Sequence, residues 1–227
     1  MEWEVSMDEL SGDEALVLML SVGLTIWLGL STFRALVQVS PLRGSTMRRA
    51  PIFISLALGF FLLEFVLANW AEKQVREHRI YHVLFILLGI AWVGISMNAM
   101  ALLGIRIRQD AVERKNGAVI IAASGAILGQ LLCYAGANIG GGETIWSTII
   151  PAFAGTFTWF ALWGLLELLS NVSEAIAIDR DVASGWRLGG VLIAMGLILG
   201  RAMAGDFHSA EETARDFLKE EIGRAHV

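Results

Sequence analysis

Glu64 is the side chain in this sequence best placed to do chemistry. It interrupts the run 51–70, in which no other residue is charged. A charge placed in hydrocarbon costs about 3 kcal/mol on insertion scales, so such a residue usually serves a function or fixes packing. A carboxyl group at this depth could carry a proton or hold a cation. It could equally stay protonated and hydrogen-bond a neighbouring helix for structural reasons alone.

Gln130 stands at the position equivalent to Glu64 in the second of three similar segments. The two residues each follow a glycine by five positions, Gly59 and Gly125 respectively, and Met195 takes the same place in the third segment. Desolvation disfavours the charged form of a carboxyl group. We therefore predict a polar layer in which Glu64 is protonated at neutral pH or paired with a polar neighbour such as Gln130.

Asn98 is the third candidate for an intramembrane polar site, and we expect it to hydrogen-bond between helices. His78 and His82 are four positions apart and could share a metal ion, but the sequence offers them no third ligand. The patterns HExxH, GxSxG, CxxC and the P-loop do not occur. We therefore expect no catalytic residues, no cofactor and no metal, and a protein that is not an enzyme.

Six apolar runs must position these side chains. Hydrophobic residues make up 56% of the 227 residues and charged residues only 17%, whereas soluble domains have roughly 25% charged residues. A helix needs about 20 apolar residues to cross about 30 Å of hydrocarbon. The fold class predicted is all-α, a polytopic membrane protein with six transmembrane helices. The predicted spans are 15–37, 51–70, 81–103, 117–136, 145–169 and 186–204.

The six predicted spans form an internal repeat of three tandem helical hairpins. Ala50, Asn116 and Asp181 are equivalent positions, 66 and 65 residues apart, and each stands just before a membrane-length helix. We therefore divide most of the chain into an N-terminal hairpin, residues 1–75, and a four-helix membrane unit, residues 76–206.

The remaining residues form a polar tail in two parts. We expect residues 207–220 to lead into a fourth hairpin that is missing from this sequence. Residues 221–227 match a translation of a common sequencing adapter, so we interpret them as a non-native end.

Glycines spaced by four mark the helix faces expected to approach closely. In membranes, small residues let two helix backbones touch. These glycines occur in the fourth and sixth spans, so the even-numbered spans are expected to be the tightly packed ones. The pattern fits contacts within one chain, a homo-oligomer or a membrane partner protein. The packing candidates are Gly125, Gly129, Gly189, Gly196 and Gly200.

Charge sets the expected orientation in the bilayer. Ten of the 17 Lys and Arg residues lie in or beside the first, third and fifth loops, and such loops are usually cytoplasmic. We predict loops 38–50, 104–116 and 170–185 inside, with the N-terminus and loop 137–144 outside. The chain has no basic stripe, so nucleic acid is not an expected partner; the lipid bilayer is.

From about residue 81 to 206 the chain resembles the YjfL-type family of small bacterial inner-membrane proteins, a family of unknown function. The resemblance rests on the segments 113–118 (ERKNGA), 123–129 (ASGAILG) and 135–139 (AGANI), with a second echo at 177–183 (AIDRDVA). Asp181 stands where the second copy commonly has Asn. The resemblance implies residence in the bacterial inner (plasma) membrane and a link to envelope maintenance, and it carries over no catalytic residue.

Two functional hypotheses follow from different classes of protein. The first is a non-enzymatic inner-membrane protein that maintains the envelope or serves as a stress-associated membrane scaffold. The second is a small transporter or channel that uses the Glu64/Gln130 layer. A solute flux assay in liposomes with Glu64→Gln as the control would discriminate between them.

Overall fold

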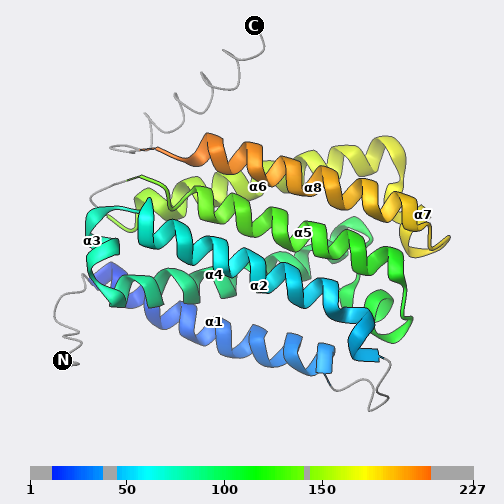
Figure 1. Ribbon diagram of the computed structural model, residues 1–227, viewed down its shortest axis with the longest axis horizontal. Coiled ribbons are helices and arrows are strands. Elements are labelled where there is room, and N and C mark those ends of the chain that lie inside the picture. The colour runs from blue at the N-terminus through cyan, green and yellow to red at the C-terminus, as the bar shows by residue number, and fades with distance from the viewer. Residues whose placement is uncertain (1–11, 38–44, 141–143, 206–227) are drawn as a thin grey trace, which may run out of the picture.

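The structure is a computed structural model that describes residues 12–37, 45–140 and 144–205. Its described part is helical, and the one β-type contact there is an isolated bridge between Ala71 and Gly140. Figure 1 shows the long helices lying side by side. In chain order the helices are α1 (Gly12–Val37), α2 (Ser45–Asn69), α3 (Lys73–Glu77), α4 (Arg79–Ala99), η2 (Met100–Leu103), η3 (Ile107–Glu113), α5 (Gly117–Gly136), α6 (Trp146–Ser170), α7 (Val172–Ala177) and α8 (Val182–Met203).

Five helical segments in the described residues are long and apolar enough to cross a membrane. They are Arg49–Asn69, Arg79–Leu103, Gly117–Gly136, Trp146–Ser170 and Val182–Met203. These segments match the second to sixth predicted spans, so the all-helical class and the capacity to span a bilayer are confirmed. The predicted first span lies within α1, and the total of six spans stays a prediction.

Two predicted loops contain more structure than the sequence indicated. The seven-residue π-helix η3 lies within 104–116, and α7 lies within 170–185. The sixth span starts at Val182 rather than at residue 186, because Asp181 caps the helix at that point. Of the loop predicted at 38–50, residues 45–50 are the first turns of α2, and residues 38–44 lie outside the described residues. The predicted tail, 207–220 and 221–227, lies outside them too.

Helices α5 and α8 begin in the same way. The Asn116 side chain accepts hydrogen bonds from the Ala118 and Val119 amides at 3.0 and 3.4 Å. The Asp181 carboxylate accepts hydrogen bonds from the amides two and three positions on, at 3.0 and 3.1 Å. Such N-caps satisfy amides that have no partner within the helix. Polar residues therefore fix where these two apolar helices start.

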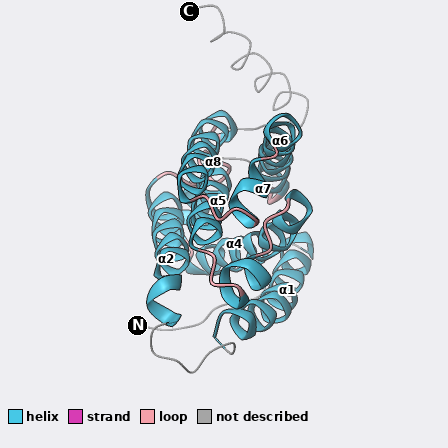
Figure 2. Ribbon diagram, turned by 90° about the vertical axis from the view of Figure 1, so that its right-hand side faces the viewer, coloured by secondary structure: helices cyan, strands magenta, loops and turns pink. Residues whose placement is uncertain are grey.

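The long helices form two layers, which Figure 2 shows end-on. One layer holds α2, α5 and α8, with α5 in the middle and its most extensive contacts made to α8 and then to α2. The other holds α1, α4 and α6, in which α1 packs on α4, while α6 covers α5 and α8. The largest interfaces thus join helices from different predicted hairpins, and the hairpin arrangement itself stays a prediction.

The core surrounds α5, whose side chains are buried on nearly every face. Helix α6 supplies two fully buried tryptophans, Trp159 and Trp163, whose rings meet edge-on with centroids 5.4 Å apart. Its opposite face is apolar and exposed, as at Phe153 and Phe157. The fifth predicted span, α6, is therefore exposed on one side only, because its Trp pair packs beside α8, where the Trp159 indole donates to the Leu192 carbonyl oxygen.

Candidate functional site

Gln130 lies at the centre of the bundle in a small polar cluster. Its side chain is fully buried, and its amide donates a hydrogen bond of 2.6 Å to the Thr156 hydroxyl oxygen. The Trp92 indole N–H donates to the same oxygen at 2.8 Å. The cluster, Gln130, Thr156 and Trp92, therefore ties α5, α6 and α4 together inside an apolar interior.

The carbonyl oxygen of the Gln130 side chain is buried and has no hydrogen-bond partner within the described structure. Leaving such an acceptor unsatisfied costs about 1–3 kcal/mol. Both N–H donors of the cluster bond to the Thr156 oxygen. The Gln130 oxygen is therefore left as a free acceptor within the described structure. Chemically, this group could accept a hydrogen bond from water or from a passing donor.

Glu64 is half-exposed at the surface of the bundle and Gln130 is fully buried, and the two side chains hydrogen-bond different partners. The Glu64 side chain is 49% exposed, whereas that of its partner His82 is 16% exposed. His82 Nδ1 lies 3.1 Å from a Glu64 carboxylate oxygen. The pair is ionic when the imidazole is protonated. The polar neighbour of Glu64 is therefore a histidine on α4, not Gln130.

Asn98 makes its hydrogen bond within its own helix. Its amide nitrogen donates to the Gly94 carbonyl oxygen at 2.8 Å, four residues back, and the residue is exposed. Within the described residues Asn98 makes no bond to another helix, because its short amide reaches the preceding turn of its own backbone. Asn98 is thus separate from both the Gln130 cluster and Glu64.

The five packing glycines all lie on the interface between α5 and α8. A Cβ atom on Gly125 would lie 2.5 Å from the Gly189 carbonyl oxygen, and one on Gly200 would lie 2.7 Å from that of Leu132. Additions at Gly129 and Gly196 would likewise meet the backbone of the facing helix. We call this contact the glycine seam, and it forms within one chain.

Sequence reasoning did not select Thr156, Trp92 or His82 as partners. Nothing in the sequence marked Thr156 or Trp92 as a hydrogen-bonding residue, since both occur within long apolar runs. The position of His82 did carry a signal: Glu64 and His82 each lie nine positions from residue 73. An antiparallel turn centred there places them side by side.

These features define a class, an all-helical protein with several helices able to span a membrane. Comparisons with known protein families, with curated proteins and with solved structures find no match to this chain. Within the described residues, no group of three His, Cys, Asp or Glu side chains is placed to hold a metal ion.

Proposed function

We propose that this chain is a non-enzymatic, multi-pass protein of the bacterial inner membrane that scaffolds or maintains the envelope. The observation that carries the proposal is the use of its intramembrane small and polar residues for packing. The glycine seam joins α5 to α8, and the Gln130 cluster joins α5 to α4 and α6. Such a bundle suits a rigid body that holds a place in the membrane.

The outer surface of the bundle supports the membrane part of this proposal. Large apolar side chains are exposed on α2, α6 and α8, beyond what monomeric soluble proteins usually present. Lipid would cover such a surface, as would a second copy of the chain or a membrane partner. Examples are Phe61, Phe153, Phe157, Leu168, Trp186 and Ile198.

A transporter or channel is the second proposal, and the spare acceptor of Gln130 is the observation in its favour. Glu64 is half-exposed and bonded to His82, so a transport path would use Gln130 and Thr156 rather than the Glu64/Gln130 layer. The exposed Glu64–His82 pair would then stand outside the path.

The two proposals separate in a paired experiment. Bacteria that express the intact chain or its Gly196→Leu variant would be placed under envelope stress, and dye exclusion by their inner membranes would be measured. Fractionation would check that each protein is present in that membrane. The scaffold proposal expects better dye exclusion with the intact chain and loss of this benefit in the variant. Gly190→Leu is the matched control, because a Cβ on Gly190 would meet nothing within 4 Å.

Purified protein in liposomes would be assayed for proton, sodium and potassium flux. The scaffold proposal expects flux equal to that of empty liposomes. Flux that disappears in Gln130→Leu, in a protein that still folds, would instead establish the transporter proposal.

A further inference from the structure

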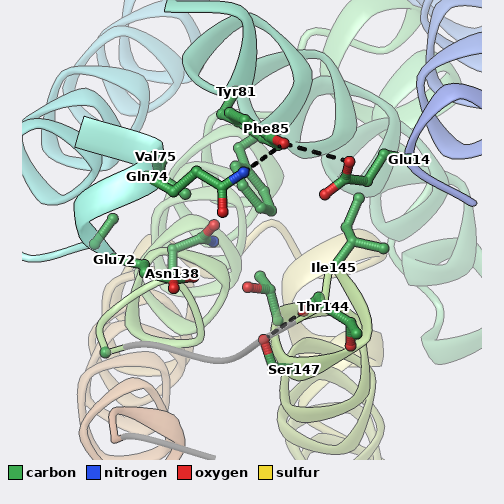
Figure 3. A pocket seen from close by; sticks show the side chains of 13 residues that line it. Glu14, Glu72, Gln74, Val75, Tyr81, Phe85, Asn138, Thr144, Ile145 and Ser147 are labelled. Carbon is green, nitrogen blue, oxygen red and sulfur yellow. Dashed lines mark hydrogen bonds between the residues drawn. The ribbon is translucent and has the colours of Figure 1, made fainter. Parts of the chain in front are cut away.

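A polar cavity lies at the end of the bundle where α2 and α5 finish and α6 begins. Its volume is about 40 Å³, whereas a single water needs roughly 10–15 Å³ by this measure. The cavity therefore has room for a small ion with one or two waters. Figure 3 shows the side chains that surround it. The polar ones used below are Glu14, Gln74, Tyr81, Asn138, Ser147 and Thr148.

Asn138 presents an unpartnered acceptor to this cavity. Its amide nitrogen donates to the Tyr134 carbonyl oxygen at 2.8 Å, which fixes the orientation of the amide group. The oxygen Oδ1 consequently has no hydrogen-bond partner within the described structure, although the residue is only 5% exposed. A buried oxygen in this state is unfavourable unless a ligand supplies a donor or a positive charge.

A second amide is held in the same way by a chain of hydrogen bonds. The Gln74 amide nitrogen donates to the Tyr81 hydroxyl oxygen at 2.9 Å, and that hydroxyl donates to a Glu14 carboxylate oxygen at 3.3 Å. Because the nitrogen of Gln74 faces Tyr81, its carbonyl oxygen is directed the other way. Figure 3 shows this oxygen turned toward Asn138. Two amide oxygens and one carboxylate thus surround the cavity.

The charge around the cavity favours a cation. No Lys, Arg or His is among the described residues that line it, whereas Glu14 and Glu72 are. The C-terminal end of α5 and the N-terminal end of α6 both lie nearby. Their dipoles correspond to about −0.5 and +0.5 elementary charge and roughly cancel. The Glu14 carboxylate, which closes the hydrogen-bond chain, supplies an anionic oxygen at the wall of the cavity.

We propose that this cavity binds a small hard cation through the side-chain oxygens of Glu14, Gln74 and Asn138. Carboxylates, amide carbonyls and water are the ligands such cations prefer, and thiol or imidazole groups are not needed. The hydroxyl groups of Ser147 and Thr148 complete the polar wall. Calcium and sodium share this ligand chemistry, and competition between them identifies the ion.

The test uses the purified full chain in detergent, with Tb³⁺ as a luminescent probe for hard cation sites. Tyr81 belongs to the site and can sensitise the bound probe. We expect saturable luminescence that Ca²⁺ or Na⁺ displaces, the stronger competitor being the ion that the site selects. Glu14→Gln and Asn138→Leu should each weaken Tb³⁺ binding at least tenfold.

Two matched controls keep this result specific. Asn69 donates to the carbonyl oxygen four residues back, as Asn138 does, but is exposed, so Asn69→Leu should leave binding unchanged. Glu77 is an exposed acid paired with Lys73, and Glu77→Gln should also have no effect. Binding that is absent in the intact chain, or equal in the site and control variants, would overturn the proposal.

A third variant covers the case in which Asn138→Leu does not fold. Asn138→Asp keeps the shape of the side chain and replaces the unpartnered carbonyl by a second charged ligand. Its affinity for Ca²⁺ should rise at least tenfold. A folded Asn138→Asp protein with unchanged or weaker Ca²⁺ affinity would rule out a cation site.

Discussion

At the scale of single residues, the buried polar groups were the hardest part to foresee. Gln130 was selected from the sequence because it breaks an apolar run, but its partners come from α4 and α6. Threonine and tryptophan are ordinary residues in such helices, so nothing in their spacing revealed that they share one acceptor oxygen. The outward direction of Glu64 was equally hidden, since rotation of a helix that is apolar on all faces is set by packing.

Thr156→Val should destabilise the bundle by about 1–3 kcal/mol, because it leaves the buried N–H groups of Gln130 and Trp92 without an acceptor. Gln130→Leu should cost less, since it also removes the carbonyl oxygen that has no partner. Unfolding in mixed detergent micelles measures both. Thr158→Val on the same helix serves as the control, and equal loss in the two threonine variants would contradict the assigned hydrogen bonds.

At the scale of helices, the ends and close contacts followed from local sequence. Asn116 and Asp181 were chosen as equivalent positions, and each caps the helix that follows it. The glycine spacing predicted close helix contact, although only the three-dimensional fold showed that α5 and α8 meet through it. Side-by-side packing of α2, α5 and α8 did not follow from the sequence, because loop lengths do not fix which interface is largest.

Gly196→Leu should disrupt the α5–α8 contact, since its side chain would enter the backbone of Gly129 on the facing helix. Overpacking of this kind costs about 1–3 kcal/mol and occasionally more. Gly190→Leu on α8 should be close to neutral. Thermal stability in detergent and monodispersity on gel filtration would be compared at equal expression, and similar stability for the two variants would refute the contact.

The cap of α8 should be sensitive to acid. Hydrogen bonds from the Ser184 hydroxyl and from the Ala183 and Ser184 amides lower the pKa of Asp181 from its ordinary value of 3.8. A lowered pKa means that the cap stabilises the fold fully above that ordinary value and loses its contribution as pH falls through the lower one. The stability difference between the intact chain and Asp181→Ala should therefore shrink in acid.

Asn116→Ala provides the comparison, because the Asn116 amide caps α5 without titrating. Its effect on thermal stability should stay constant over the same pH range. A difference for Asp181→Ala that grows as the pH falls would contradict the assigned direction of the shift.

At the scale of the whole molecule, the helical membrane class was predictable and the site was not. Composition and run length suffice for the class, since they report how much apolar surface must avoid water. The polar cavity joins residues as distant in sequence as Glu14 and Asn138. Its assembly depends on how α1, α3 and α4 meet the residues that follow α2 and α5 and those that begin α6, which no local pattern encodes.

We predict that the end of the bundle carrying α3 faces outside and the end carrying η3 faces the cytoplasm. In a Cys133→Ser background, Lys73→Cys should react with an impermeant thiol reagent added to intact cells. Arg108→Cys, at an exposed position within η3, should react only after permeabilisation. The opposite labelling pattern would reverse the orientation.

The turns before α5 and α8 place a basic residue in a backbone conformation that glycine would adopt more easily. Lys115 and Arg180, which directly precede the two caps, both adopt positive φ angles, 54° and 57°. A side chain in this left-handed region costs about 1 kcal/mol, which glycine would avoid. Glycine would also remove a positive charge, and positive charges in loops favour retention of those loops in the cytoplasm during membrane insertion. We therefore expect Lys115→Gly and Arg180→Gly to stabilise the finished fold but to increase the fraction of chains inserted in the wrong orientation.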